Sequence, residues 1–170
     1  MNGLHRKWTR KMNTEQRDVL SFHLKHGFPV AQDINDCTDP DATDELRIAS
    51  MQLKSLSKLL EAPAMRADAY HHDTRLWNIH LLVEEVGELA EAMSKHDEAE
   101  VCDALGDILY VALGVAVRYN LPAKKIFDEV HRSNMTKDYR SDNNGRLRNK
   151  GPNYSPPNMR KILEEFSDNG

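Results

Sequence analysis

The sequence predicts an all-α fold, a helical bundle built around an antiparallel pair of helices. Apolar residues recur at helical spacing in several long segments, and no alternating strand pattern or internal repeat is present. The two most apolar segments are joined only by SKHDEAE, and so short a connection favours antiparallel neighbours. A chain of 170 residues is also long enough to bury one hydrophobic core.

Helix boundaries follow from capping residues, glycines and prolines. The expected helices cover residues 14–25, about 44–63, 73–95, 97–119, 123–133 and 159–166. Thr14 is the expected N-cap of the first helix, which ends at Gly27 and Pro29. Pro63 is expected to end the second helix, because proline lacks the N–H that a helix interior requires, and a loop-like segment follows to residue 72.

The chain changes in character after Asp138. The segment RSDNNGRLRNKGPNYSPPN is rich in Asn, Gly, Pro and basic residues and has no periodicity, which predicts a long loop. We therefore expect a helical domain over residues 1–138, with the central helix pair at about 73–119. Residues 139–170 are expected to add a basic loop and a short helix to the same domain.

Composition narrows the classes of function. The net charge of −4 and the 6% of aromatic residues argue against a nucleic-acid partner, which requires a basic surface or a stacking platform. The basic N-terminal segment lacks the apolar centre of a signal peptide, and the longest apolar run, 108–117, is about half a membrane span. Two distant cysteines do not form a disulfide framework. We expect a soluble cytoplasmic protein with neither a membrane nor a nucleic acid as its partner.

Acidic residues lie inside both of the most apolar segments. They are Glu84, Glu85 and Glu88 in LLVEEVGELAEA, and Glu100, Asp103 and Asp107 in the segment that begins EVCDALGDILYV. At about 100° per residue, Glu85 falls within the apolar stripe of its helix and Glu88 at the edge of that stripe, whereas Glu84 lies further towards solvent. The three acidic residues of the next helix share an arc of about 60°.

Carboxylates on two packed helices repel one another unless cations neutralise them. Oxygen ligands alone suit Mg²⁺ or Mn²⁺ better than zinc. The pattern therefore predicts an acidic metal site between the two helices. Two other interpretations remain, an ordinary solvated acidic face and a carboxylate-bridged di-iron bundle. The second normally requires Glu-x-x-His on two helices, and no Glu-x-x-His occurs in this sequence.

These residues resemble the MazG-like all-α nucleoside triphosphate pyrophosphohydrolase superfamily, which includes dimeric dUTPases and phosphoribosyl-ATP pyrophosphohydrolases. The signature of that superfamily is Glu-Glu-x-x-Glu on one helix and Glu-x-x-Asp on the next. Glu84, Glu85 and Glu88 match its first half, and the likeness covers about residues 76–137.

The second half of the signature fits in two registers. Glu100 and Asp103 match Glu-x-x-Asp literally. Alternatively Asp107, which is followed by ILY, is the aspartate of the family. In that register the family glutamate would fall on Ala104, and Asp103 would have to replace it. Both registers stay open at the level of sequence.

The resemblance implies hydrolysis of a nucleoside or deoxynucleoside triphosphate to the monophosphate and pyrophosphate, with Mg²⁺ or Mn²⁺ as cofactor. The metal ligands that it implies are Glu85, Glu88, Glu100, Asp103 and Asp107. Glu84 and Glu85 are the expected catalytic residues, with Glu84 as the candidate general base. Asn134 and Lys137, in HRSNMTKD, match a downstream Asn-x-x-Lys element that would contact the phosphate or sugar of the substrate.

Lys150 and Tyr154 extend the expected substrate site. They lie in GRLRNKGPNYSPPN, where Arg146 and Arg148 add two more positive charges. A basic loop of this kind could close over a triphosphate. A docking tail is an equally compatible interpretation of the same residues.

The same residues are compatible with two other functions. One is a MazG-like binding or regulatory module without catalysis, which the departure at Ala104 leaves open, and the other is phosphoribosyl-ATP pyrophosphohydrolysis. The helix at 97–119 is apolar nearly all round, which predicts a central helix with a partner chain over its remaining apolar face. We therefore expect a homodimer or homotetramer, as the resemblance also implies.

Overall fold

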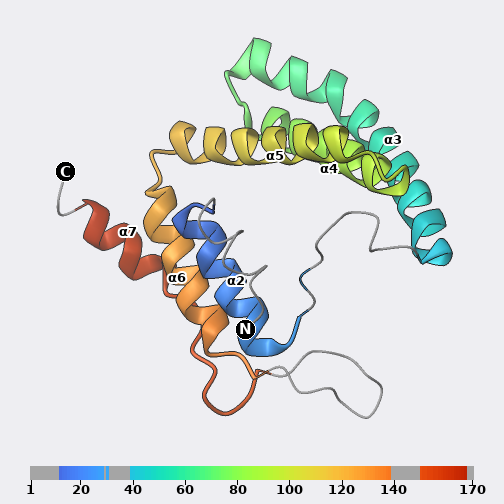
Figure 1. Ribbon diagram of the computed structural model, residues 1–170. Coiled ribbons are helices and arrows are strands. Elements are labelled where there is room, and N and C mark those ends of the chain that lie inside the picture. Colours follow the sequence, from blue (N-terminus) through green and yellow to red (C-terminus); the bar gives the residue numbers. More distant parts are fainter. Residues whose placement is uncertain (1–11, 29, 31–38, 139–149, 168–170) are drawn as a thin grey trace. The chain divides into compact units, whose positions relative to one another are not determined.

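The fold is that of a computed structural model, which describes residues 12–28, 30, 39–138 and 150–167. Within these residues the chain forms six α-helices and no strand, which confirms the all-α prediction (Figure 1). The helices are α2 (Thr14–His26), α3 (Pro40–His71), α4 (Arg75–Ser94), α5 (Glu98–Arg118), α6 (Ala123–Met135) and α7 (Met159–Ser167).

The chain divides into two compact units. The hairpin unit, residues 31–120, contains α3, α4 and α5, and α4 packs against both of the other helices. The terminal unit, residues 1–30 and 121–170, contains α2, α6 and α7, and α6 packs against both of the others. The predicted domain extents, 1–138 and 139–170, stay a prediction.

The predicted antiparallel helix pair is confirmed as α4 and α5. Lys95, His96 and Asp97 connect the two helices, with His96 in the left-handed region at a φ of 54°. Asp97 is the N-cap of α5, and its Oδ1 accepts hydrogen bonds from the backbone N–H groups of Ala99 (3.1 Å) and Glu100 (3.2 Å). The cap satisfies two of the amides that a helix start leaves without partners.

The prediction that Pro63 ends a helix is wrong, and so is the loop predicted after it. α3 continues through Pro63 to His71, and the turn to a left-handed conformation comes only at His72, with a φ of 51°. Ala64, directly after the proline, is completely buried. Packing of α3 against α4 and the burial of Ala64 therefore offset the lost helical hydrogen bond, so that tertiary contacts override the local preference.

Small side chains bring α3 and α4 close together. The buried residues of α3 are Ser50, Ser57 and Ala64, each seven positions from the next. Opposite them on α4 is the buried Gly87, where an added Cβ would lie only 3.2 Å from Leu53 Cβ. The contact therefore depends on small residues, which permit helices to approach more closely than large apolar ones.

The first helix starts one residue away from the predicted cap. Asn13, not Thr14, is the N-cap of α2, because Asn13 Oδ1 accepts from the Gln16 N–H (2.8 Å) and Gln16 Oε1 accepts from the Asn13 N–H (3.0 Å). This reciprocal pair is a capping box, and it requires a Gln or Glu three residues after the cap. The predicted end of the helix at Gly27 is confirmed by a left-handed φ of 70°.

The other helices of the hairpin unit leave most of α5 uncovered. Ala104 is its only buried residue, so the central position predicted for this helix is not reached inside the hairpin unit. Four large apolar side chains are 48–82% exposed at intervals of four residues, namely Leu105, Leu109, Leu113 and Val117. These four residues are called the α5 apolar face below.

Candidate active site

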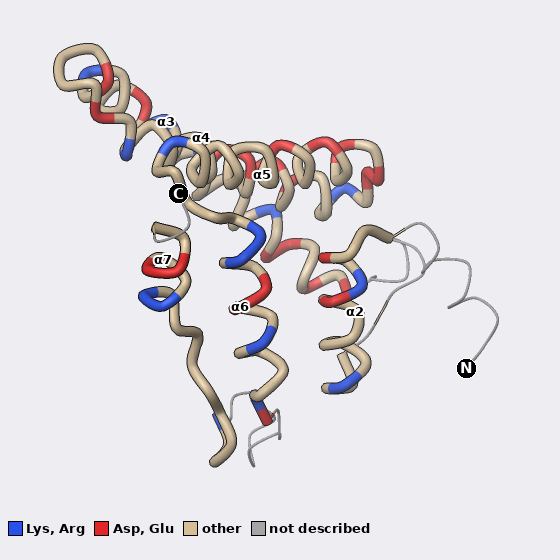
Figure 2. The backbone as a smooth tube through the Cα atoms, turned by 90° about the vertical axis from the view of Figure 1, so that its left-hand side faces the viewer, with Lys and Arg blue, Asp and Glu red and all other residues tan. Residues whose placement is uncertain are grey.

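Two helices of the hairpin unit bring the predicted acidic residues together. α4 carries Glu84, Glu85 and Glu88, and α5 carries Asp103 and Asp107. Figure 2 marks acidic positions along both helices. Because these helices pack against each other, carboxylates from separate segments of the sequence form one group. Glu85 is half-buried, whereas Glu88, Asp103 and Asp107 are exposed.

Glu85 is the acidic residue whose pKa is raised by burial and by these neighbouring negative charges. Burial raises the pKa of its carboxyl above the ordinary value, and the neighbouring charges of Glu88, Asp107, Glu84 and Asp103 raise it further. In addition, Glu85 Oε2 is buried and accepts no hydrogen bond from the described residues. A buried carboxylate oxygen without a partner is costly, so this position suits a bound cation.

Two acidic residues of α5 act on the acidic group of α4. Asp103 and Asp107 are the α5 residues whose charges act on Glu85. A hydrogen bond to Glu91 is the main cause that raises the pKa of Lys95, in the connection before α5, and the charge of Glu100 adds a smaller effect in the same direction. Asp103 and Asp107 are thus brought close enough to the acidic group on α4 for their charges to act on Glu85.

The donor set fits a hard divalent cation, because every candidate ligand is a carboxylate. Among the described residues, no three His, Cys, Asp or Glu side chains stand close enough together to bind an ion as they are. Glu88, Asp103 and Asp107 are three of the four carboxylates whose charges act on Glu85, and all three are exposed. Rotamer changes can therefore bring their oxygens towards Glu85.

A buried histidine, which the sequence analysis did not assign to the site, lies next to Glu84. His80 Nδ1 is 3.0 Å from Ser57 Oγ and 3.1 Å from the Ser57 carbonyl oxygen on α3. Since a carbonyl oxygen only accepts, Nδ1 carries a proton when it makes that bond. His80 Nε2 lies 3.8 Å from Glu84 Oε2, so the candidate general base has a fixed neighbour four residues earlier on the same helix.

The predicted substrate-binding residues belong to the terminal unit. Asn134 is in the last turn of α6, and Lys137 follows the helix end, where its N–H donates to the Asn134 carbonyl (3.1 Å). Lys150 Nζ lies 4.9 Å from the centre of the Tyr154 ring, a cation–π distance. Arg146 and Arg148 lie outside the described residues.

Asn134 and Lys137 lie at the end of α6, and Lys150 and Tyr154 lie in a segment that contacts it. We name residues 150–158 the strap. Gly151 approaches Asp138 so closely that an added Cβ would lie 2.8 Å from Asp138 Cβ. The backbone N–H of Ser155 donates to Thr136 Oγ1 (2.9 Å). The end of α6 and the strap are therefore in contact, and the four predicted substrate contacts lie on these two segments.

The C-terminal end of α2 reaches the same surface. Lys25 Nζ donates to the Met135 carbonyl, and His26 forms a hydrogen bond with the backbone of Asn134. Burial lowers the pKa of His26, with the Lys25 charge acting in the same direction. The sequence does not predict that Lys25 and His26 contact α6, because nothing in their local spacing connects them to that helix.

No helix in the described part of the chain is both long and apolar enough to span a bilayer. Residues 53–134 match the family model described as phosphoribosyl-ATP pyrophosphohydrolase. This segment includes the whole α4–α5 pair and Asn134, and it supports a nucleotide pyrophosphohydrolase type of activity. No match was found among curated proteins or among solved structures.

Proposed function

Because this chain belongs to the MazG-like all-α pyrophosphohydrolase superfamily through residues 53–134, we propose that it hydrolyses a nucleoside or deoxynucleoside triphosphate to the monophosphate and pyrophosphate. The observation that carries the proposal is Glu85. Its carboxylate has a buried, unpartnered oxygen and lies among acidic residues of two helices inside the matched segment. A substrate with clustered phosphate charges and its Mg²⁺ would fit such a group.

Each acidic residue has a proposed role. Glu85, Glu88, Asp103 and Asp107 would hold Mg²⁺ or Mn²⁺, with Glu100 as an additional ligand from the first turn of α5. The cation would supply charge neutralisation for the phosphates and for the leaving pyrophosphate. Glu84, beside His80, would accept a proton from the water that adds across the anhydride bond between the α and β phosphates.

The terminal unit would supply substrate contacts. Lys137 and Lys150 offer positive charge to phosphate oxygens, and Asn134 can both donate to and accept from the sugar. Tyr154 presents an aromatic ring beside Lys150. A positive surface of this kind lowers the repulsion between an acidic protein and a triphosphate.

The central test is pyrophosphate release from a panel of nucleoside triphosphates with Mg²⁺ and with Mn²⁺. Glu88→Gln should reduce turnover by about 100-fold or more while the helical content stays unchanged. Glu91→Gln is the matched control, because Glu91 lies one turn further along α4 and pairs with Lys54 and Lys95. It should keep nearly full activity. Undiminished pyrophosphate release by Glu88→Gln would refute the assignment.

Phosphoribosyl-ATP belongs in the same panel, because the matched family model carries that description. Turnover of this compound in preference to all nucleoside triphosphates would replace the proposed substrate class. Binding of nucleotides without release of pyrophosphate from any of them would instead indicate a regulatory module.

We also propose that the protein is a homodimer or homotetramer. The α5 apolar face carries four large side chains that the other helices of the hairpin unit leave exposed. A second copy that buried them would give α5 the central position that its composition predicts.

A further inference from the structure

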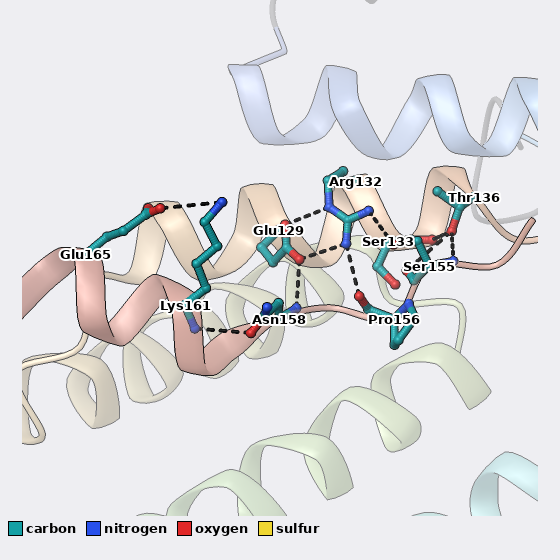
Figure 3. A network of polar contacts seen from close by, with 9 residues as sticks. All are labelled: Glu129, Arg132, Ser133, Thr136, Ser155, Pro156, Asn158, Lys161 and Glu165. Atoms are coloured by element: carbon teal, nitrogen blue, oxygen red, sulfur yellow. Dashed lines mark hydrogen bonds and ion pairs between the residues drawn. The ribbon is translucent and has the colours of Figure 1, made fainter.

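The strap is tied to α6 by a network of side chains that neither the acidic site nor the predicted substrate contacts include (Figure 3). Arg132 donates from Nη1 to Ser155 Oγ (3.0 Å) and from Nη2 to the Pro156 carbonyl oxygen (3.0 Å). Glu129 Oε1 accepts from the backbone N–H of Asn158 (2.7 Å). Ser155, Pro156 and Asn158 of the strap are thereby held on one helix.

Arg132 and Glu129 are themselves locked together. The guanidinium donates from Nε to Glu129 Oε2 (2.7 Å) and from Nη2 to Glu129 Oε1 (2.8 Å). The hydrogen bond from Arg132 lowers the pKa of Glu129 to about 2, and the Asn158 N–H acts in the same direction. Because the guanidinium is planar with donors in fixed directions, a two-pronged pair with Glu129 leaves its remaining donors aimed at the strap.

Thr136 holds the strap one turn further along. Its hydroxyl donates to the Ser133 carbonyl (2.7 Å) and accepts from the Ser155 N–H (2.9 Å). The first bond orients the hydroxyl so that its lone pairs face Ser155. Two separate anchors, Arg132 and Thr136, therefore determine the register of the strap along α6.

Lys150 and Tyr154 directly precede these anchors in the chain. The N–H of Tyr154 donates to the Gly151 carbonyl (2.9 Å), which closes a tight turn, and Gly151 packs on Asp138 next to Lys137. Once Ser155 is docked, the turn that carries Lys150 and Tyr154 has little freedom left. A substrate then binds without first ordering this loop, which would otherwise reduce affinity.

We propose that Arg132 and Thr136 are positioning residues, which dock the strap on α6 and so hold the turn of Lys150 and Tyr154 ready to bind the phosphates of the substrate. The inference rests on the proposed function and adds to it how the substrate contacts are assembled. Both anchors belong to the terminal unit, whereas the acidic group belongs to the hairpin unit. Their loss should weaken substrate binding and leave the chemical step unchanged.

The test compares Arg132→Lys and Thr136→Val with the wild type in steady-state kinetics. Both variants should raise KM about tenfold, with kcat within about twofold, because the strap contributes binding contacts only. Thr136→Ser keeps the hydroxyl and should restore the wild-type KM. Arg160→Lys makes the same replacement at an exposed position of α7 and should leave both constants unchanged. Far-ultraviolet circular dichroism and melting curves confirm that each variant folds.

Limited trypsin digestion reports on the strap without any substrate. Cleavage after Lys150, followed by mass spectrometry, should be several-fold faster in Arg132→Lys and Thr136→Val than in Arg160→Lys and Thr136→Ser. An unchanged KM in the two anchor variants would overturn the inference. A fall in kcat at constant KM would overturn it as well.

The inference can fail separately from the proposed function. If the wild type releases no pyrophosphate from any triphosphate, the proposed function fails, and binding of a non-hydrolysable nucleoside triphosphate decides the role of the anchors. About tenfold weaker binding by Arg132→Lys and Thr136→Val supports that role. Equal dissociation constants for these variants and the wild type reject it.

Discussion

Glu85 lies among like charges that the described residues do not offset. Burial comes first among the causes that raise the pKa of its carboxyl, and four neighbouring carboxylates add to the effect. A carboxyl whose pKa is raised on folding is destabilising while it is ionised, since the folded state then holds a charge that the unfolded chain keeps in water. Such a residue is expected at a cation-binding site and is difficult to explain as a stabilising contact.

Replacing Glu85 by Gln should therefore stabilise the protein in EDTA at neutral pH. We expect a gain of roughly 0.5–1 kcal/mol, a few tenths for each like charge relieved, in urea unfolding followed by circular dichroism. The gain should shrink as the pH falls through the raised pKa of Glu85, and it should be lost below the ordinary value of 4.5, where the carboxyl is largely neutral in both the folded and the unfolded chain. Adding Mg²⁺ should stabilise the wild type more than Glu85→Gln, because only an ion that binds the folded state raises stability. A loss of stability in EDTA would contradict the crowding of charges.

Individual acidic residues show how much of the site the local sequence pattern predicts. Helical phase places Glu85 in the apolar stripe, and the structure shows it half-buried. Glu84, predicted further towards solvent, is also half-buried, whereas Glu88, predicted at the edge of the stripe, is exposed. Glu100 shares an arc with Asp103 and Asp107, yet its charge acts on Lys95. The helical positions of residues on one helix predict which of them share a face. They do not predict which residues of that face lie nearest to the neighbouring helix.

At the level of whole elements, the approach of α3 to α4 depends on Gly87. A Cβ at this position would meet Leu53 Cβ and Lys54 Cγ, both at 3.2 Å. Lys54 can turn away, whereas Leu53 Cβ is attached to the backbone, so relief requires α3 to move. The close contact of the two helices is therefore expected to be intolerant of a single methyl group.

Gly87→Ala should lower the free energy of unfolding by about 1 kcal/mol, because the overpacking outweighs the gain in helix propensity. Gly114→Ala is the matched control, since Gly114 is exposed in α5 with no atom within 4 Å of an added Cβ. That variant should raise the free energy of unfolding by about 0.5–1 kcal/mol. Urea unfolding measures both. Equal stabilisation by the two replacements would show that the helices do not approach closely at Gly87.

Glu91 links the same two helices electrostatically. Hydrogen bonds from Lys54 of α3, and then from Lys95, lower the pKa of Glu91 to about 2, against 4.5 for an unperturbed glutamate. A depressed pKa contributes stability that is fully present above 4.5 and is lost as the pH falls from 4.5 through 2. The side chain is 37% exposed, so salt should screen part of the effect.

The melting temperature of the wild type should exceed that of Glu91→Gln at pH 7, and the difference should vanish as the pH approaches 2. Sodium chloride at about 1 M should reduce the difference at neutral pH. Glu61→Gln, at an exposed position of α3, is the control and should change little. A difference that does not vary with pH would rule out the ion pairs as its source.

For the whole molecule, the main feature is the α5 apolar face, whose large apolar side chains are exposed. Val117 is 82% exposed and Leu109 57%, although α5 lies in a segment as apolar as a central bundle helix. Exposed apolar side chains at four-residue intervals form a continuous stripe that favours association.

Leu109→Glu combined with Leu113→Glu should convert the protein from a dimer or tetramer to a monomer, measured by size-exclusion chromatography with light scattering. Each change places a charge in the centre of the proposed interface. Leu59→Glu makes the same replacement on α3, where Leu59 is 71% exposed, and should leave the assembly intact. A wild-type protein that is already monomeric at micromolar concentration would contradict the proposed assembly. Dissociation by Leu59→Glu alone would place the interface on α3.

The sequence by itself determined the helical class, the α4–α5 pair and the acidic residues that belong to it. These depend on local spacing and on a short connection, so neighbouring residues contain the necessary information. The tertiary structure decided which α5 carboxylates face Glu85, whether α3 passes through Pro63, and how Arg132 and Thr136 bind the strap. Each of these depends on packing or hydrogen bonds between residues far apart in the chain, and such contacts form only when separate helices have docked.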